Sequence, residues 1–314
     1  MNIVFCGTPE FAVPALAALL DAADLAVRLV VCQPDRPSGR GLGLASPPVK
    51  QLALERGIPV AQPSRIKENP EFRGQLQSFM PDAIAVVAYG RILPPWMLGL
   101  PKFGNVNLHA SLLPKYRGAA PIQWAVASGE TVTGVTTMRL DEGMDTGDLL
   151  LQAACPIQPE DTAETLAPRL AALGAPLLLA TLRGLAAGQI RPEPQDAGAA
   201  TYAPLLKKED GRIAFNRTAA EIAHRLRGFM PWPGAYSRFR GKALSLWDVI
   251  PASLPSGTSP LAPGQLLASG DNLFVGCGNA TVLEISCLQV EGKKRMPAAD
   301  FVHGYRPQPG ESFG

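Results

Sequence analysis

Short apolar runs alternate with stretches of helical spacing along the first half of the chain. Residues 2–6 form an apolar run that ends at Gly7, and residues 11–20 carry apolar side chains at helical spacing. Residues 83–88 are apolar without interruption, as in a strand that is covered on both faces. Further strands are predicted at 25–32, 58–60 and 105–109, and further helices at 48–56 and 119–127. Strands that alternate with helices predict an α/β domain.

Two β-rich runs, at residues 133–140 and 149–155, flank a connection rich in glycine and aspartate. This arrangement is typical of an antiparallel pair. A helix is predicted over residues 163–187, with a break near Gly174–Pro176 because proline interrupts helical hydrogen bonding. Residues 188–203 are rich in proline and small side chains and are predicted to form a linker.

The chain changes in character after this segment. One helix is predicted at residues 218–227, followed by short strands at 243–249, 264–268, 272–276 and 281–289. Short strands separated by glycine-containing turns predict a small β-barrel or sandwich. We therefore predict an α/β domain over residues 1–187, a linker over 188–203 and a small β domain over 204–314.

Composition adds a charge asymmetry to this picture. The chain has 314 residues, of which 46% are hydrophobic and 18% charged, so a disordered chain is excluded. Residues 201–314 carry 13 Lys/Arg and 9 Asp/Glu, whereas residues 1–200 carry 16 and 18. The basic rear part suggests contact with a polyanion, although a chance imbalance of surface charge explains the numbers equally well.

The five cysteines are odd in number, widely spaced and never arranged as CxxC. Neither a disulfide framework nor a zinc site is therefore indicated, and reduced thiols are typical of a cytosolic protein. The N-terminus lacks a signal-peptide pattern, and no apolar run reaches ~18 residues. We expect a cytoplasmic protein that does not enter a membrane.

The turn after the first strand gives no dinucleotide fingerprint. Gly7-Thr-Pro-Glu-Phe-Ala12 lacks the GxGxxG pattern, and the glycine-rich run at residues 39–43 lies inside a loop instead of opening a helix. An NAD-dependent enzyme is therefore disfavoured.

The strand at residues 105–109 carries the most suggestive chemistry. Asn105, Asn107 and His109 share one face, because side chains two apart in a strand point the same way. An amide beside an imidazole can stabilise an oxyanion and move protons. A strand-end pair that only caps a loop remains the alternative.

Four acidic residues lie in the turn between the β-rich runs at 133–140 and 149–155: Asp141, Glu142, Asp145 and Asp148. Their spacing fails the EF-hand pattern, and a solvated turn explains most of them. One of the four could orient His109, which is the support that an active imidazole usually requires.

These residues carry a resemblance that extends over nearly the whole chain. The sequence is similar to the 10-formyltetrahydrofolate-dependent formyltransferases. The matching segments are Phe5-Cys-Gly-Thr-Pro9, Gln33-Pro-Asp-Arg-Pro37, Val87-Ala-Tyr-Gly90, Asn107-Leu-His-Ala-Ser-Leu-Leu-Pro114, Arg117-Gly-Ala-Ala-Pro-Ile-Gln123, Gly143-Met-Asp-Thr-Gly-Asp148, Pro231-Trp-Pro233 and Gly292-Lys-Lys294.

The loop at residues 33–43 and the β-rich tail point to the branch of this superfamily that modifies aminoacylated tRNA. The implied fold is a Rossmann-like α/β formyltransferase domain followed by a small C-terminal β-barrel of the OB type. The implied reaction is attack by the α-amino group of methionine, carried by initiator tRNA, on the formyl carbon of 10-formyltetrahydrofolate. The resemblance implies a monomer whose partners are methionyl initiator tRNA and folate, with neither metal nor NAD.

The resemblance also assigns roles to individual residues. Asn107 and His109 would stabilise the tetrahedral oxyanion, and Asp145 would hold the imidazole and take up the proton that the amine loses. The implied folate-binding residues are Ser111, Leu112, Leu113, Pro114, Val86, Ala88, Tyr89 and Gly90. The implied tRNA-binding residues are Arg36, Arg40, Arg212, Lys293 and Lys294. Gly41-Leu-Gly-Leu44 stands where relatives often carry lysines, so we expect either weaker phosphate contact by this loop or a looser loop.

The shared Asn/His/Asp core leaves other formyl-transfer enzymes open. Sugar-nucleotide formyltransferases and formyltetrahydrofolate hydrolase or dehydrogenase domains use the same core. The Pro34–Arg40 loop and the basic rear domain favour tRNA, and the chain has no room for an aldehyde-oxidising domain. A non-catalytic RNA-binding module is the alternative from another class, and the intact Asn107, His109 and Asp145 argue against it.

Overall fold

The computed structural model describes residues 1–38 and 43–314, and the chain divides into two compact units. The first unit comprises Met1–Pro121, Val132–Pro156 and Ala167–Pro204. The second unit comprises Ile122–Thr131, Ile157–Leu166 and Leu205–Gly314. Two segments from the predicted α/β domain thus pack with the C-terminal residues, a feature that the hydrophobic pattern did not reveal. The division of the chain at residues 188–203 stays a prediction.

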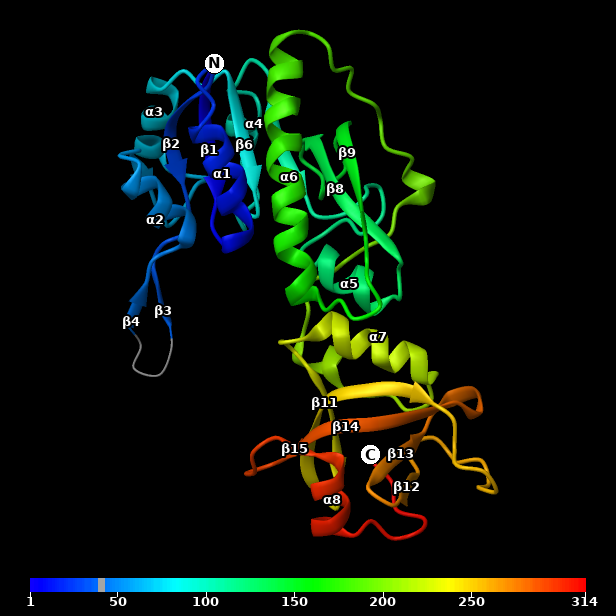
Figure 1. Ribbon diagram of the computed structural model, residues 1–314. Helices are drawn as coiled ribbons and strands as arrows, with labels where there is room; N and C mark the ends of the chain where they lie inside the picture. Colours follow the sequence, from blue (N-terminus) through cyan, green and yellow to red (C-terminus); the bar gives the residue numbers. More distant parts are fainter. Residues whose placement is uncertain (39–42) are drawn as a thin grey trace. The chain divides into compact units, whose positions relative to one another are not determined.

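The first unit is built on a mixed sheet, shown in blue to green in Figure 1. In the part of the chain that the structure describes, it has seven strands in the order β5–β2–β1–β6–β7–β8–β9. The strands are β1 (Asn2–Gly7), β2 (Ala26–Val31), β5 (Val60–Ala61), β6 (Ala83–Val87), β7 (Asn105–His109), β8 (Val132–Arg139) and β9 (Leu149–Pro156). The first five strands of that order are parallel, and β7–β8 and β8–β9 are antiparallel, as predicted for the last pair.

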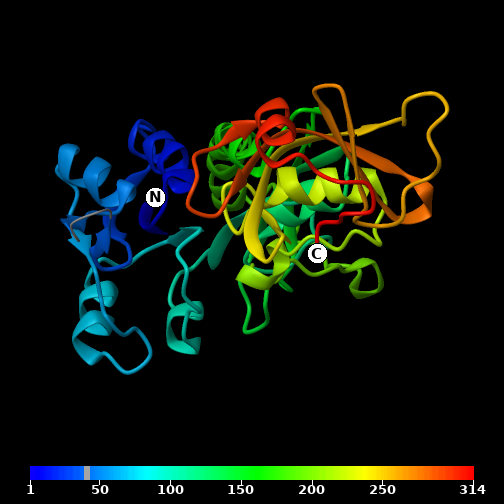
Figure 2. The same ribbon diagram turned by 90° about the horizontal axis from the view of Figure 1, so that it is seen from below.

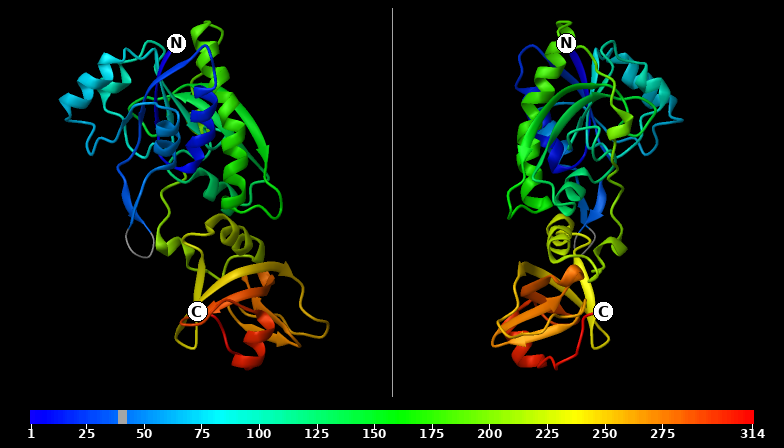
Figure 3. Two further views of the ribbon diagram at one scale, coloured as in Figure 1. Left: turned by 60° about the vertical axis from the view of Figure 1, so that its left-hand side comes forward. Right: turned by 90° about the vertical axis from the view of Figure 1, so that its right-hand side faces the viewer.

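Helices cover both faces of this sheet because its central strands are apolar on both sides. The helices are α1 (Val13–Leu20), α2 (Pro48–Glu55), α3 (Pro70–Ser78), α4 (Pro95–Leu98) and α6 (Ala163–Ala186), of which residues 167–186 belong to this unit. Val4 and Ile84 share one core cluster with Phe72 of α3 and Met97 of α4. The opposite face lies against α1 and α6 (Figures 1 and 3).

The break predicted in the long helix near Gly174–Pro176 is wrong. Helix α6 continues through both internal prolines. Its packing on the sheet explains this: a Cβ on Gly174 would lie 2.6 Å from Leu108 of β7, and the hydroxyls of Thr181 and Thr137 are 2.8 Å apart. Among the described residues α6 alone is long and apolar enough to cross a membrane, and one of its faces packs on the sheet.

The strand order places a crevice at one edge of the sheet. From β1 the chain passes to β2 and β5 on one side and then returns to β6 and β7 on the other. The order therefore reverses between β1 and β6, and in open α/β sheets ligands bind outside the carboxyl ends of the strands at such a point. His109, at the end of β7, lies at this edge.

The segment predicted as a loop at residues 33–43 contains a hairpin. Strands β3 (Arg36–Ser38) and β4 (Gly43–Ala45) pair in antiparallel register. The repeated glycine and proline in this segment concealed the strands, because both residues are poor strand formers.

The second unit contains the predicted small β domain. Its antiparallel sheet runs in the order β10–β11–β14–β13–β12, with β15 paired to β14. The strands are β10 (Ala235–Phe239), β11 (Lys242–Ala252), β12 (Leu266–Ser269), β13 (Asn272–Gly276), β14 (Val282–Val290) and β15 (Met296–Pro297). Strand β10 was not predicted; it joins β11 through Arg240 and Gly241, which both have positive φ, as a tight hairpin requires. The connection between β11 and β12 projects from the sheet (Figure 2).

Three helices pack within the second unit. They are α5 (Pro121–Ala127), α7 (Ala219–Phe229) and α8 (Ala298–Tyr305), the last of which was not predicted. Thr218 caps α7 by accepting the Glu221 amide, and the Glu221 carboxylate accepts the Thr218 amide in return. Trp124 of α5 meets Phe229 of α7 edge to face at 5.3 Å.

Candidate functional site

The two asparagines of strand β7 have different surroundings. Asn105 is buried, and its amide donates to the carbonyls of Met97 and Leu98 at 3.1 and 2.9 Å, so it holds α4. Asn107 is half-buried and forms no side-chain hydrogen bond to the described residues. Of the two asparagines on this face, Asn107 is therefore the one that is available to a substrate.

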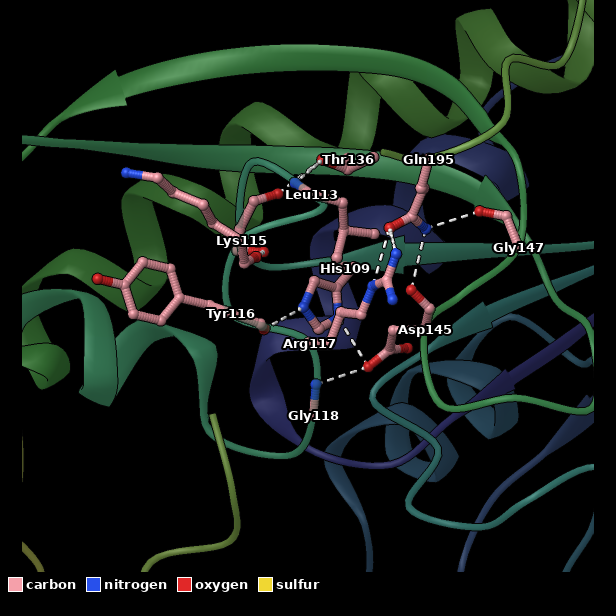
Figure 4. Close-up of polar contacts among 11 residues, drawn as sticks. His109, Leu113, Lys115, Tyr116, Arg117, Gly118, Thr136, Asp145, Gly147 and Gln195 are labelled. Atoms are coloured by element: carbon pink, nitrogen blue, oxygen red, sulfur yellow. Dashed lines mark hydrogen bonds and ion pairs between the residues drawn. The ribbon is translucent and has the colours of Figure 1, made fainter. Parts of the chain in front are cut away.

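Both ring nitrogens of His109 face oxygen atoms of the protein. The side chain is 6% exposed, and Nε2 donates to the carbonyl oxygen of Tyr116 at 2.9 Å (Figure 4). Nδ1 lies 3.7 Å from Oδ2 of Asp145. Because a carbonyl only accepts, Nε2 carries a hydrogen and anchors the ring, while Nδ1 and Asp145 form the looser contact.

Of the four acidic residues in the turn between β8 and β9, Asp145 is the one that meets the imidazole. Its backbone has φ of 54°, a left-handed conformation that is uncommon outside glycine. Oδ2 accepts the Gly118 amide at 2.8 Å. Asp141 instead closes the turn on itself, by accepting the Gly143 amide and the Thr146 hydroxyl.

The residues expected to line a folate site after β6 lie at the same edge of the sheet. Val86 and Tyr89 are buried, whereas Ala88 and Gly90 are exposed and have φ of 46° and 81°. Val86 is paired in register with Asn107, so this wall adjoins the β7 site directly. Burial raises the pKa of the Tyr89 hydroxyl, which therefore stays protonated.

The loop Ser111–Pro114 uses most of its polar groups internally. Ser111 donates to the Lys115 carbonyl at 2.6 Å. The Leu113 amide donates to the Thr136 hydroxyl at 3.1 Å, and its carbonyl accepts Nε2 of Gln152 at 2.8 Å. Ser111 and Leu113 are buried, so the half-buried Leu112 and Pro114 supply the surface that a ligand could contact.

Sequence reasoning missed a polar cluster at the crevice. Gln33 donates to the Tyr89 carbonyl at 3.2 Å and accepts Nε of Arg91 at 3.0 Å, and Arg91 also donates to the Ser64 carbonyl. Arg91, Arg65 and Lys67 line an open cleft of about 320 Å³. These residues follow three different strands, so the sequence pattern offered no signal that joins them.

Three of the five cysteines are buried thiols that are not prepared as nucleophiles. Burial raises the pKa of Cys32 and of Cys277 to about 11, and raises that of Cys6 further. A thiol reacts as its thiolate, and these groups are protonated at neutral pH.

The hairpin β3–β4 is held at its base by Asp35. The carboxylate accepts Nζ of Lys50 at 2.7 and 2.9 Å and Nε2 of Gln62 at 2.7 Å. Hydrogen bonds from Gln62 and Lys50 hold the pKa of Asp35 below its usual value. Arg36 is exposed at the start of β3, and Arg40 lies outside the described residues.

The predicted basic residues of the second unit lie on its surface. Arg212 is exposed and, with Lys208 and Arg238, lines a cleft of about 780 Å³ that also contains Tyr236 and Trp247. Lys293 and Lys294 are exposed between β14 and β15. Arg295 stacks over the Trp247 ring at 3.1 Å, a cation–aromatic contact that sequence reasoning missed.

Comparison with known proteins gives consistent matches along the chain. Residues 1–182 match the family described as formyl transferase, and residues 205–306 match the formyl transferase C-terminal domain. The chain is 59% identical over 314 residues to the methionyl-tRNA formyltransferase of Koribacter versatilis, covering 100% of this chain and 99% of that protein. It is 58% identical to the protein of the same name from Acidobacterium capsulatum, with all of both chains covered.

The fold also matches a solved structure at low sequence identity. The sugar 3N-formyl transferase WlaRD, solved in the presence of dTDP and 5-N-formyl-THF, superposes with a TM-score of 0.66 at 18% identity, covering 94% of this chain and 99% of that chain. On the strength of the two domain matches and the full-length relatives, the chain belongs to the methionyl-tRNA formyltransferase family of formyl transferases.

Proposed function

We propose that this protein transfers the formyl group of 10-formyltetrahydrofolate to the α-amino group of methionine on initiator tRNA. The observation that carries this proposal is the arrangement of Asn107, His109 and Asp145 at the carboxyl edge of the sheet, in a chain with full-length relatives of that name. The protein is proposed to act as a cytoplasmic monomer.

The reaction requires one bond to form, one to break and one proton to move. The amine nitrogen bonds to the formyl carbon, the bond from that carbon to the folate nitrogen breaks, and the amine proton ends on that nitrogen. The oxygen of the formyl group gains negative charge on the way, and a preorganised donor stabilises that charge. The free amide of Asn107 is suited to this role.

The hydrogen bond that anchors His109 determines which ring nitrogen is available for proton transfer. Nε2 is engaged with the Tyr116 carbonyl at 2.9 Å, so Nδ1 is the nitrogen that can exchange a proton with the substrate. Asp145, 3.7 Å away, can accept a proton from Nδ1 or hold it there. This pair gives the amine proton a route away from the attacking nitrogen.

The crevice suits a folate in two ways. Leu112 and Pro114, in the loop after His109, offer partly exposed apolar surface, which suits a flat pterin ring. Arg91, Arg65 and Lys67 place positive charge in the neighbouring cleft, which suits the carboxylates of the glutamate part of the donor.

The second unit suits a nucleic acid. Cations and two aromatic rings share its cleft of about 780 Å³, and cations with aromatic rings bind phosphates and stack bases. Lys293 and Lys294 add a further exposed basic point.

The test is formyl transfer from 10-formyltetrahydrofolate to methionine-charged initiator tRNA, with free methionine and an amino sugar nucleotide as parallel acceptors. Formylation of the charged tRNA alone supports the proposal, and His109→Ala should abolish it while leaving tRNA binding intact. Formylation of the sugar nucleotide, or release of formate to water, would overturn the assigned acceptor. An unchanged rate in His109→Ala would overturn the assigned site.

A further inference from the structure

A single glutamine side chain joins the two loops that surround His109. Nε2 of Gln195 donates to the carbonyl oxygens of Asp145 at 2.9 Å and Gly147 at 2.7 Å. Its Oε1 accepts Nε and Nη2 of Arg117 at 3.0 and 2.7 Å (Figure 4). Every polar atom of this amide is thus used, one end on the Asp145 turn and the other on the loop after β7.

Arg117 fixes the orientation of that amide. Its side chain is 5% exposed, and two N–H groups that converge on Oε1 define which end of the Gln195 amide is the oxygen. The NH₂ end is therefore directed at the two carbonyls, which only a donor can satisfy. Arg117 is also next to Gly118, whose amide binds the Asp145 carboxylate.

Gln195 belongs to a segment, residues 193–203, that contains a short 3-10 helix at Ala197–Ala199 and that we call the strap. Glu193 exchanges two backbone hydrogen bonds with Leu149, at the end of the Asp145 turn. Further along, the Thr201 hydroxyl accepts the Tyr116 amide at 2.8 Å, and its carbonyl accepts the Arg117 amide at 2.8 Å. The strap therefore holds the loop that carries the acceptor for Nε2 and the turn that carries the carboxylate for Nδ1.

We propose that Gln195, held by Arg117, is a positioning residue for formyl transfer. Its hydrogen bond to the Asp145 carbonyl stabilises the left-handed backbone conformation of Asp145, in which the carboxylate faces Nδ1 of His109. Without the two bonds to the carbonyls, the Asp145 turn can relax, and the distance between Asp145 and His109 increases. This inference rests on the proposed function, because its readout is formyl transfer.

Two substitutions distinguish a role in positioning Asp145 from a role as hydrogen-bond acceptor for Arg117 alone. Gln195→Ala removes both ends of the amide. Gln195→Glu keeps an oxygen for Arg117, as a salt bridge, but presents a second oxygen instead of a donor to the Asp145 and Gly147 carbonyls. We expect both variants to lower kcat by roughly 10- to 100-fold, as misplaced catalytic groups do, with KM for charged tRNA and for the folate donor unchanged.

The matched controls are Gln189→Ala and Gln189→Glu, at an exposed glutamine of the same unit outside the strap. Both should retain wild-type kcat. Gln195 is only half-buried, so its variants should fold, and melting temperatures will confirm this.

If Gln195→Glu keeps the wild-type kcat while Gln195→Ala has a low kcat, the Gln195 amide acts only as an acceptor for Arg117, and the inference is overturned. So would a rise in KM at constant kcat, or no effect in either variant. If wild-type protein formylates a different acceptor, the proposed function fails separately, and the same variants are measured with the acceptor that it uses.

Discussion

Nδ1 of His109 lies 3.7 Å from Oδ2 of Asp145, and that same oxygen accepts the backbone amide of Gly118. The carboxylate therefore has a fixed partner on one side and a looser one on the other, as a group that exchanges a proton requires. Asp145→Asn keeps an acceptor for Gly118 but removes the charge. We expect kcat to fall roughly 100-fold or more. Glu142→Gln, an exposed change in the same turn, should leave kcat unaltered, and equal losses in both variants would contradict the assignment.

Asp35 is expected to act on tRNA through the hairpin that it anchors. Asp35→Asn weakens the contacts with Lys50 and Gln62 and should loosen the base of β3–β4. Loss of a hydrogen bond to a charged group should raise KM for charged tRNA roughly 10-fold, while KM for the folate donor stays constant. Asp21→Asn breaks an exposed ion pair with Arg56 elsewhere in the same unit and serves as the control. A parallel rise in both KM values would argue against a role confined to the hairpin.

Position 118 requires glycine for two reasons: its positive φ and the lack of space for a Cβ atom. Its φ is 124°, and a Cβ would lie 2.6 Å from the Ala203 carbonyl of the strap. Gly118→Ala should lower the free energy of unfolding by about 1–3 kcal/mol from backbone strain, with a further loss from the clash. Gly188→Ala serves as the comparison, because Gly188 has a φ of 68°, which alanine tolerates better, and open space around the Cβ, so this variant should cost less stability than Gly118→Ala. Equal denaturant midpoints in the two variants would contradict this.

The second unit should lose stability in acid through Glu311. A bidentate contact with Arg240, together with the Gln308 amide, holds the pKa of Glu311 at about 2, below its usual 4.5. A lowered pKa in the folded state stabilises the fold above pH 4.5, and this stabilisation disappears as the pH falls from 4.5 toward 2. Urea titrations at pH 5 and pH 3 should show a smaller change in Glu311→Gln than in the wild type. An identical pH dependence would exclude this ion pair as a contributor.

Lys293 and Lys294 are expected to contact phosphates and not bases. Replacing both with alanine should reduce the slope of log Kd against log salt concentration by about 1 for each phosphate that a lysine no longer neutralises. Lys102→Ala, an exposed lysine of the first unit, is the control. Weaker binding with an unchanged slope would show that these lysines act in another way.

The elements that local pattern determines could be predicted from the sequence. The strand bounds at residues 105–109 match the structure because the alternation of apolar and polar residues begins after Gly104 and ends at His109. The pairing of β8 with β9 followed from the turn between them. The continuity of α6 could not be predicted, because it depends on packing between Gly174 and Leu108.

Residue type alone left several candidates for the site open. Two asparagines shared a face with His109 and four acidic residues lay in one turn, and the family resemblance selected Asn107 and Asp145 among them; the structure brings His109 and Asp145 together. Gln195 carries no such signal, since an isolated glutamine in a proline-containing segment looks like any solvated linker residue. Its importance comes from hydrogen bonds to residues 48 to 78 positions earlier, which no local pattern encodes.

The packing of α5 against α7 has a consequence for how the chain is made. Trp124 meets Phe229, and the Arg227 guanidinium donates to the Asp161 carbonyl, so the second unit includes segments that leave the ribosome 66 to 105 residues before their partners. During synthesis, the apolar surface of those early segments stays exposed until α7 emerges from the ribosome. A nascent chain halted before residue 219 should therefore engage chaperones that a chain released after residue 229 no longer needs.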